Sequence, residues 1–130
     1  MRLADDKMCF VCGQRNDHGL RLQFRIDEDG KMRTEFTPQK VHQGFVDIAH
    51  GGIIAMILDE IMVNLLWRLG KHAVTAEMNI KFKKPTTVGK TLYFTGEIAR
   101  QTRRIIYTRA DAKKADGSTV ASATAKCIKV

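Results

Sequence analysis

The sequence predicts an α+β fold in which an antiparallel sheet of five to six strands wraps around one long central helix. Three observations lead to this prediction: runs of alternating apolar and polar residues at both ends of the chain, one long apolar segment between them, and turn residues that join neighbouring runs. With 130 residues, of which 44% are apolar, the chain has the size of a single domain spanning residues 1–130.

The first expected element is a hairpin of two strands. Residues 20–26 and residues 31–36 each alternate apolar and polar side chains. Because successive side chains of a strand point to opposite faces, this alternation is typical of half-buried strands. Residues 28–30, Glu-Asp-Gly, supply turn chemistry between them, and Pro38 ends the pair.

The central helix is expected over residues 53–69, where thirteen of seventeen residues are apolar. Such a helix extends about 25 Å at about 1.5 Å per residue, and Gly70 is a preferred residue just after a helix end. Its charged residues, Asp59 among them, leave it short of the roughly 20 clean apolar residues that a membrane span needs. We therefore expect a buried helix and no membrane partner.

Four more strands are expected after the helix, because alternation resumes and turn residues separate the runs. They cover residues 74–83, 91–101, 105–115 and 118–130. Asp116 and Gly117 form a strong two-residue hairpin signal between the last two. Such a sheet has exposed edges, which proteins often pair or cover, so we expect a homo-oligomer.

The charge balance favours an anionic partner. Twenty-two Lys and Arg against fourteen Asp and Glu leave a formal net charge of +8. The basic residues are scattered, and no aromatic-rich RNA-binding signature accompanies them, so nucleic acid is disfavoured. Residues 1–8 contain no basic stretch followed by an apolar signal core, which predicts a cytoplasmic protein.

The three cysteines allow two interpretations, a zinc site and reduced thiols. Cys9 and Cys12 have the spacing of a zinc-binding pair, with His18 nearby, but Cys127 lies almost at the other end of the sequence. A closed zinc site needs four ligands. We therefore favour reduced, partly buried thiols and expect no metal.

The helix carries two adjacent acids that point about 100° apart, since each turn takes 3.6 residues. Glu60 shares a stripe with Asn64 and Arg68, which favours a solvated acid or a partner along the helix. Asp59 has apolar residues on the turns before and after it. Burial there penalises the charged form, which suits a general base or nucleophile. A structural aspartate bonded to a strand, or an interface residue, is an equal alternative.

The step His50-Gly51-Gly52 lies where the helix begins. A helix N-terminus presents free backbone N–H groups and the positive end of the dipole, which together suit a developing oxyanion. A glycine there lets a substrate carbonyl approach closely. On these three residues alone, a plain loop-to-helix turn in which His50 caps or positions the helix entry is the stronger interpretation.

The run from His50 to Asp59 resembles the HGG-x₆-D signature of the PaaI-like, or 4-hydroxybenzoyl-CoA-thioesterase-type, hotdog thioesterases. The expected strand order also matches that fold along nearly the whole chain. Further similarity lies in residues 9–13, 19–20, 74–85, 103–104 and 116–121.

This resemblance implies an acyl-CoA thioesterase that needs no further cofactor and forms a dimer or a dimer-of-dimers tetramer, with active sites at the subunit interface. The Gly51 N–H would polarise the thioester carbonyl, and Asp59 of the neighbouring subunit would attack it or activate water. Gly52 would lie against the substrate. The family often has a catalytic Asn or Gln at the position of Gly44. Gln43 stands one residue away and is the candidate for that role, with an ordinary loop residue as the equal alternative.

Coenzyme A carries phosphates, which family members hold with surface Lys and Arg side chains. The candidates in this chain are Lys83, Lys84, Arg103 and Arg104, each of which is otherwise an ordinary exposed charge. A hotdog protein that binds acyl-CoA without turnover is the first alternative, since binding and catalysis share one groove. A hotdog hydratase is another, for which Asp47 and His50 are only a loose match.

Overall fold

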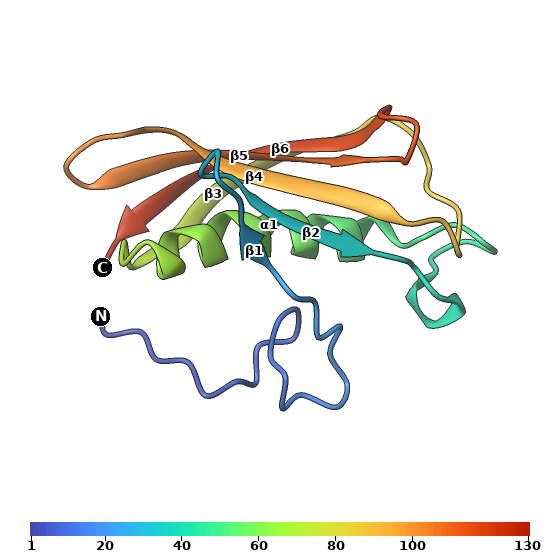
Figure 1. Ribbon diagram of the computed structural model, residues 1–130, viewed down its shortest axis with the longest axis horizontal. Helices are drawn as coiled ribbons and strands as arrows, with labels where there is room; N and C mark the ends of the chain where they lie inside the picture. The colour runs from blue at the N-terminus through green and yellow to red at the C-terminus, as the bar shows by residue number, and fades with distance from the viewer.

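The computed structural model describes all residues from 1 to 130 and has six strands, one long helix and one short 3₁₀ helix. In chain order these are β1 (Arg25–Ile26), β2 (Met32–Phe36), η1 (Lys40–His42), α1 (Gly51–Arg68), β3 (Ala73–Phe82), β4 (Leu92–Gln101), β5 (Ile105–Lys113) and β6 (Thr119–Lys129). The strands form one antiparallel sheet in the order β1-β2-β4-β5-β6-β3. The sheet curves over one side of α1 (Figure 1), so the predicted α+β fold is confirmed.

α1 begins two residues earlier than the apolar pattern predicts. His50 is its N-cap: its Nδ1 accepts a hydrogen bond of 2.8 Å from the Gly52 N–H. This bond satisfies one of the free donors at the helix start, so the helix can include both glycines. At the other end, α1 stops at Arg68, and Gly70 follows with a φ of +72° that favours glycine.

The core lies between α1 and the concave face of the sheet. The helix buries one broad apolar face, and β4 passes directly across it at Gly96. A Cβ atom at Gly96 would lie 3.2 Å from both the Cγ1 and Cγ2 atoms of Ile61. Glycine at this position therefore lets the helix and β4 approach closely, which is one reason why α1 is held in a fixed place on the sheet.

The first strand is much shorter than predicted. Alternation from residue 20 to residue 26 predicts a full strand, but only Arg25–Ile26 pair with β2. The backbone N–H groups of Leu20 and Leu22 instead donate to carbonyl oxygens of Phe10 and Val11. Arg21 between them has a φ of +51°, which breaks the strand. The prediction was wrong because the partner of this stretch is the preceding loop.

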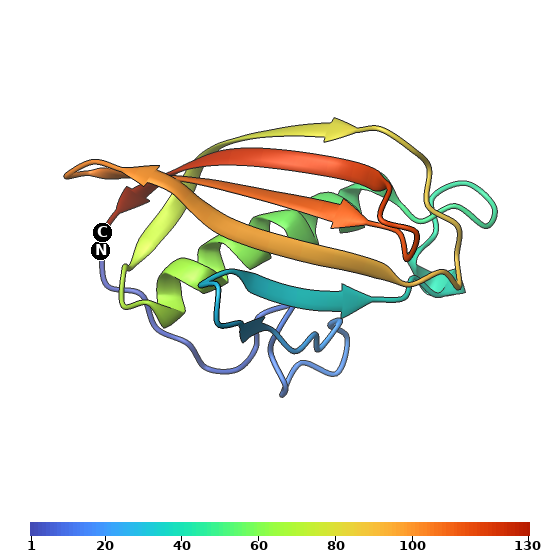
Figure 2. The ribbon, with the colours of Figure 1, turned by 45° about the horizontal axis from the view of Figure 1, so that its top comes forward.

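The N-terminal segment, residues 1–22, covers the face of α1 that the sheet leaves open. Figures 1 and 2 show it in blue, running along the helix on the side away from the sheet. It turns between Cys9 and Gly13, where the Gly13 N–H donates to the Cys9 carbonyl at 2.8 Å. α1 therefore lies between the sheet and this segment.

β3 is an edge strand with an irregularity in it. It pairs with β6 on one side only, and its register shifts between Thr75 and Glu77. A bulge of this kind changes which face the following side chains point to. As a result Thr75 before the bulge, and Met78 and Ile80 after it, all face α1, although strict alternation predicts Thr75 on the opposite face.

The two ends of the molecule have different features. The loop from residue 41 to residue 49 and the start of α1 lie at one end, and the turn between β4 and β5 lies at the other (Figures 1 and 2).

None of the helices combines the length and the apolar character that crossing a lipid bilayer requires.

Candidate active site

The backbone N–H of Gly51 makes no hydrogen bond within the chain. Gly51 is the first residue of α1, and the neighbouring Gly52 N–H is taken up by the His50 side chain. His50 thus holds the helix entry, the role that the sequence assigns to it, while Gly52 has no free N–H to offer a ligand. The Gly51 N–H lies at the positive end of the helix dipole, so it can receive an oxygen that gains negative charge.

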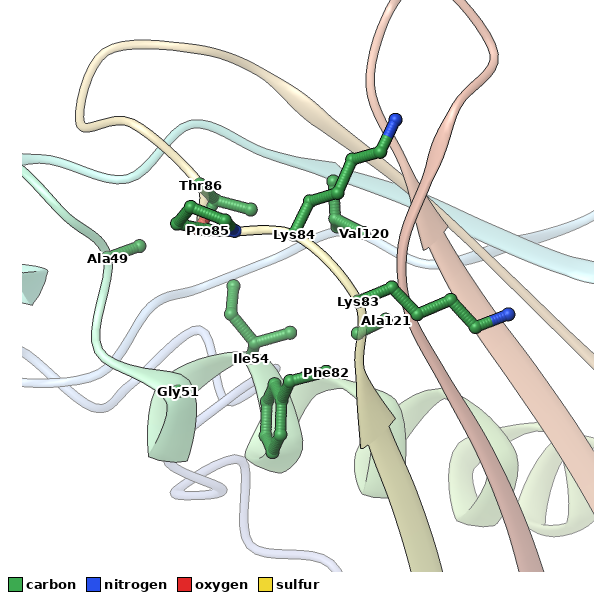
Figure 3. Close-up of a pocket in the computed structure, with 10 residues that line it drawn as sticks. All are labelled: Ala49, Gly51, Ile54, Phe82, Lys83, Lys84, Pro85, Thr86, Val120 and Ala121. Carbon is green, nitrogen blue, oxygen red and sulfur yellow. The ribbon is translucent and has the colours of Figure 1, made fainter.

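A cavity of about 280 Å³ opens beside Gly51 (Figure 3). Its lining is partly apolar and includes Ile54, Phe82 and Val120, and the Phe82 ring lies 3.5 Å from the position of a Cβ atom on Gly51. Lys83 and Lys84 follow along its rim, and their ammonium groups point away from Gly51 toward solvent. The cavity can take an apolar group near the free N–H, with positive charge outside it.

The Asp59 carboxylate lies half-buried on α1, where the Thr75 Oγ1 donates a hydrogen bond of 2.7 Å to its Oδ1. The other oxygen, Oδ2, makes no hydrogen bond within the chain. Thr75 comes from β3, and its side chain reaches Asp59 because the bulge after it directs it inward. One carboxylate oxygen is therefore fixed, and the other is free to contact a water molecule or a substrate.

A larger cavity of about 1360 Å³ adjoins Asp59. It lies between α1, the start of β3 and the N-terminal segment, and it includes Val63, Trp67 and Phe24 among its apolar walls. The carboxylate thus faces a space that is large enough for an organic ligand and is closed on one side by the N-terminal segment.

Gly51 and Asp59 cannot act on one carbonyl group within one chain. They are eight residues apart on α1, which corresponds to about 12 Å along the axis at about 1.5 Å per residue. The cavity beside Gly51 and the cavity beside Asp59 share no lining residue. If the two groups act together, the Gly51 N–H and the Asp59 carboxylate must come from different copies of the chain.

Glu60 is not the solvated surface acid that its stripe favours. It is half-buried, and its Oε1 accepts a hydrogen bond from the Cys12 thiol at 3.1 Å and one from Asn64 Nδ2 at 3.2 Å. The Arg68 Nε in turn donates to Asn64 Oδ1 at 3.0 Å, so the expected pairing along the helix is present. The prediction of a solvated surface acid was wrong because the N-terminal segment covers this side of the helix.

Gln43 lies in the loop before α1 and supports that loop. Its Oε1 accepts a hydrogen bond of 3.1 Å from the backbone N–H of Asp47, a residue with a φ of +62°. His42 beside it accepts from the Gln39 N–H through Nδ1 at 2.9 Å, and burial lowers the pKa of its imidazole. Neither side chain lines the cavities beside Gly51 and Asp59.

Arg103 and Arg104 lie far from Lys83 and Lys84 within one chain. They occupy the turn between β4 and β5. The Lys129 N–H donates to the Arg104 carbonyl, so this turn lies near the end of β6 and the beginning of β3, the strand that follows α1. Lys83 and Lys84 lie at the opposite end, near the start of α1 (Figures 2 and 3). The four basic residues therefore do not form one patch on a single chain.

Two residues of the site carry no clear signal in the sequence. Thr75 stands at a polar position of an alternating run, so its inward direction depends on a bulge that the pattern does not reveal. Cys12 has the spacing of a metal ligand with Cys9, but no pattern in the sequence links it to Glu60, because that contact depends on where the N-terminal segment lies.

The chain is similar in sequence to known thioesterases. The family model of the thioesterase superfamily matches residues 47–121, the stretch that contains Gly51, Asp59 and Thr75. Human acyl-coenzyme A thioesterase 13 is 28% identical over 95 residues, which cover 71% of this chain and 68% of that protein.

Solved structures share the fold. The crystal structure of protein RHA08564, a thioesterase superfamily protein, superposes with a TM-score of 0.89 at 26% identity; the match covers 95% of this chain and 61% of that one, so this chain spans less than two thirds of its length. A hypothetical thioesterase of Streptococcus pneumoniae, crystallised with coenzyme A, has a TM-score of 0.78 at 22% identity over 84% of this chain and 85% of its own.

The matched family model covers more than half of the chain, and the architecture agrees with the family's solved members. The chain belongs to the thioesterase superfamily.

Proposed function

We propose that this protein is an acyl-CoA thioesterase that works as a homodimer, with each active site formed by Gly51 of one subunit and Asp59 of the other. The observation that carries the proposal is the pair of unused groups: a Gly51 N–H without an acceptor and an Asp59 carboxylate with one free oxygen beside a large cavity. A thioester needs such a donor for its carbonyl oxygen and such a base or nucleophile for its carbonyl carbon.

The free edge of β3 supports the dimer. β3 runs beside α1, with Thr75 near Asp59 at its beginning and Phe82 near Gly51 at its end. If two copies pair these edges antiparallel about a two-fold axis, the end of one β3 lies beside the beginning of the other. Gly51 of the partner subunit then approaches Asp59, which overcomes the separation of about 12 Å within one helix.

The hydrolysis consumes one water molecule and yields a carboxylic acid and the coenzyme A thiol. The Gly51 N–H stabilises the negative charge on the carbonyl oxygen while the carbonyl carbon becomes tetrahedral. In one route Asp59 attacks the carbonyl carbon, the C–S bond breaks, and water hydrolyses the resulting mixed anhydride. In the other route Asp59 removes a proton from the water that attacks the carbonyl carbon, and the C–S bond then breaks. In both routes the leaving thiolate takes up a proton and the acid is released. Thr75 positions the carboxylate by holding one of its oxygens.

Coenzyme A is the proposed carrier of the acyl group. The streptococcal structure with coenzyme A and the human acyl-coenzyme A thioesterase are both similar to this chain. Lys83 and Lys84 extend from the rim of the Gly51 cavity into solvent, so they are proposed to meet the phosphates. Arg103 and Arg104 can contribute only from another copy, given where they lie on the chain. A cytoplasmic location remains a prediction from the sequence.

A thiol-release assay tests the proposal. Asp59→Asn is expected to lower the rate of hydrolysis of a range of acyl-CoA thioesters by at least about tenfold, since a positioned acid or base typically contributes 10²–10⁴. Glu60→Gln is the matched control, because it changes the adjacent carboxylate on the same helix, and it should affect the rate far less.

Equal losses from the two variants would show that Asp59 has no special role. Tight binding of an acyl-CoA by the wild-type protein without release of thiol would instead support a binding protein of this fold. Folding of both variants is checked by their circular dichroism spectra and melting temperatures, so that a misfolded protein is not mistaken for an inactive one.

A further inference from the structure

A second cluster of reactive groups lies beside the candidate active site and takes no part in the proposed hydrolysis. Cys9 and Cys12 of the N-terminal segment meet Glu60 of α1, and their two sulfur atoms and one carboxylate oxygen all lie within 4.8 Å of one another. The Cys12 Sγ and the Glu60 Oε1 are 3.1 Å apart. All three side chains are half-buried on the wall of the large cavity.

We propose that Cys9, Cys12 and Glu60 bind one zinc-type divalent cation that joins the N-terminal segment to α1. Two thiolates and a carboxylate are ligands that Zn²⁺ accepts in proteins. Three protein ligands leave a fourth position open, and in this site it faces the cavity that Asp59 also lines. The fourth ligand would be a water molecule or a small ligand atom.

The spacing of the three ligand atoms suits such an ion. With Zn–S distances of about 2.3 Å and a Zn–O distance of about 2.0 Å, tetrahedral geometry places the ligand atoms about 3.5–3.8 Å apart. The observed separations, 3.1 Å for one pair and no more than 4.8 Å for any, lie on both sides of that range. Small rotations of the side chains are therefore enough to accommodate the ion.

The turn that carries the cysteines is held in a fixed shape. The Cys12 N–H points to the Cys9 Sγ at 3.5 Å, and the Gly13 N–H bonds to the Cys9 carbonyl. A Cβ atom on Gly13 would lie 2.5 Å from the backbone N and O atoms of Cys9, so only glycine fits this turn. The Cys12 N–H directed at the Cys9 Sγ supports a thiolate at Cys9. Burial and the neighbouring Glu60 carboxylate raise the pKa of the Cys12 thiol, so Cys12 keeps its proton until an ion displaces it.

The carboxylate is positioned as well. Asn64, which is buried, donates to Glu60 Oε1, and Arg68 in turn donates to Asn64. Partners of this kind orient a metal ligand and are needed for full affinity. Arg68 also adds a positive charge near a site whose three ligands would carry three negative charges against two on the ion.

Binding of the ion releases the two thiol protons of Cys9 and Cys12. Without metal, the Cys12 thiol donates its proton to a hydrogen bond with Glu60. On binding, the ion replaces this proton and that of Cys9, and both protons pass to solvent. The sequence does not predict this site, because Glu60 is 48 residues from Cys12 and only the fold brings the two together.

Metal titration of the full chain tests this site. Untagged protein is stripped with a chelator, dialysed and titrated with Co²⁺, followed by Zn²⁺ as competitor. The proposal predicts one Co²⁺ per chain, a sulfur-to-metal charge-transfer band, the visible bands of tetrahedral Co²⁺, and loss of both on addition of Zn²⁺. Cys12→Ser should remove the charge-transfer intensity of one thiolate, and Glu60→Gln should weaken binding by at least about tenfold.

The controls are Cys127→Ala and Glu77→Gln, which change a buried thiol and an exposed carboxylate outside the cluster and should bind Co²⁺ as the wild type does. Wild-type protein that shows no charge-transfer band would overturn the proposal. So would unchanged affinity in Glu60→Gln, or equal loss of binding in the controls. If Cys12→Ser fails to fold, Glu60→Gln still decides, because it retains both thiols.

Discussion

Asp59 and Glu60 are neighbours in the sequence and contact different parts of the molecule. Asp59 is bonded to Thr75 on β3, whereas Glu60 is bonded to Cys12 of the N-terminal segment. The difference follows from the turn of about 100° between adjacent helix positions. We therefore propose a separate chemistry for each carboxylate, and the two can be tested independently by single substitutions.

The role of the Gly51 N–H can be tested by removing that one donor. Gly51→Pro deletes the N–H, and proline is well tolerated at the first position of a helix. His50 has a φ of −62° and a ψ of 127°, which is the extended conformation that a residue before proline adopts. We expect kcat to fall by about 10²–10³, the typical effect of losing one oxyanion donor.

The matched control is Gly51→Ala, which adds a Cβ atom but retains the N–H. That atom would lie 3.5 Å from the Phe82 ring, an ordinary contact, so the variant should keep most of its activity. Steady-state kinetics of both variants separate the two effects. Similar losses in the two would mean that space beside the helix, and not the donor, is what the site requires.

At the scale of elements, the sequence predicts which segments are strands and helix better than it predicts where they begin and turn. The apolar run identifies α1, and Asp116 with Gly117 identifies the turn between β5 and β6, because these signals are local. The bulge at residue 76 and the shortened β1 depend on contacts with other segments. The direction of Thr75 could therefore not be predicted, although the strand that carries it was.

The loop before α1 exposes several apolar side chains beside the free edge of β3. Phe45 and Val46 are 84% and 73% exposed. The Ala49 N–H bonds to the Thr86 carbonyl, just after β3, so this loop lies next to the proposed dimer interface. The double change Phe45→Ser and Val46→Ser should weaken the dimer by at least about tenfold, because burial of each apolar side chain contributes about 1.5–3 kcal/mol.

The measurement is the concentration dependence of molecular mass in analytical ultracentrifugation. Tyr93→Ser serves as the control, since Tyr93 is an exposed aromatic residue on β4, which β5 and β6 separate from β3. The loop variant should keep the melting behaviour of a folded chain at high protein concentration. A dimer of unchanged strength would exclude this loop from the interface.

At the scale of the whole molecule, two features of the architecture support the proposed dimer. The sheet ends in a ten-residue strand, β3, with one free edge, and the two proposed reacting groups lie on one helix about 12 Å apart. The sequence could identify both groups, since each has a local signal: a glycine step before the helix and an acid among apolar neighbours. Their separation is evident only from the helix that joins them.

Hybrid dimers test the central claim most directly. Two inactive variants, Asp59→Asn and Gly51→Pro, are expressed together with different affinity tags, and dimers that carry both tags are isolated. If each active site combines the two subunits, one site in every hybrid is intact, and thiol release should return to about half of the wild-type rate, as two-fold symmetry requires. Hybrids as inactive as the parent variants would contradict a site shared between subunits.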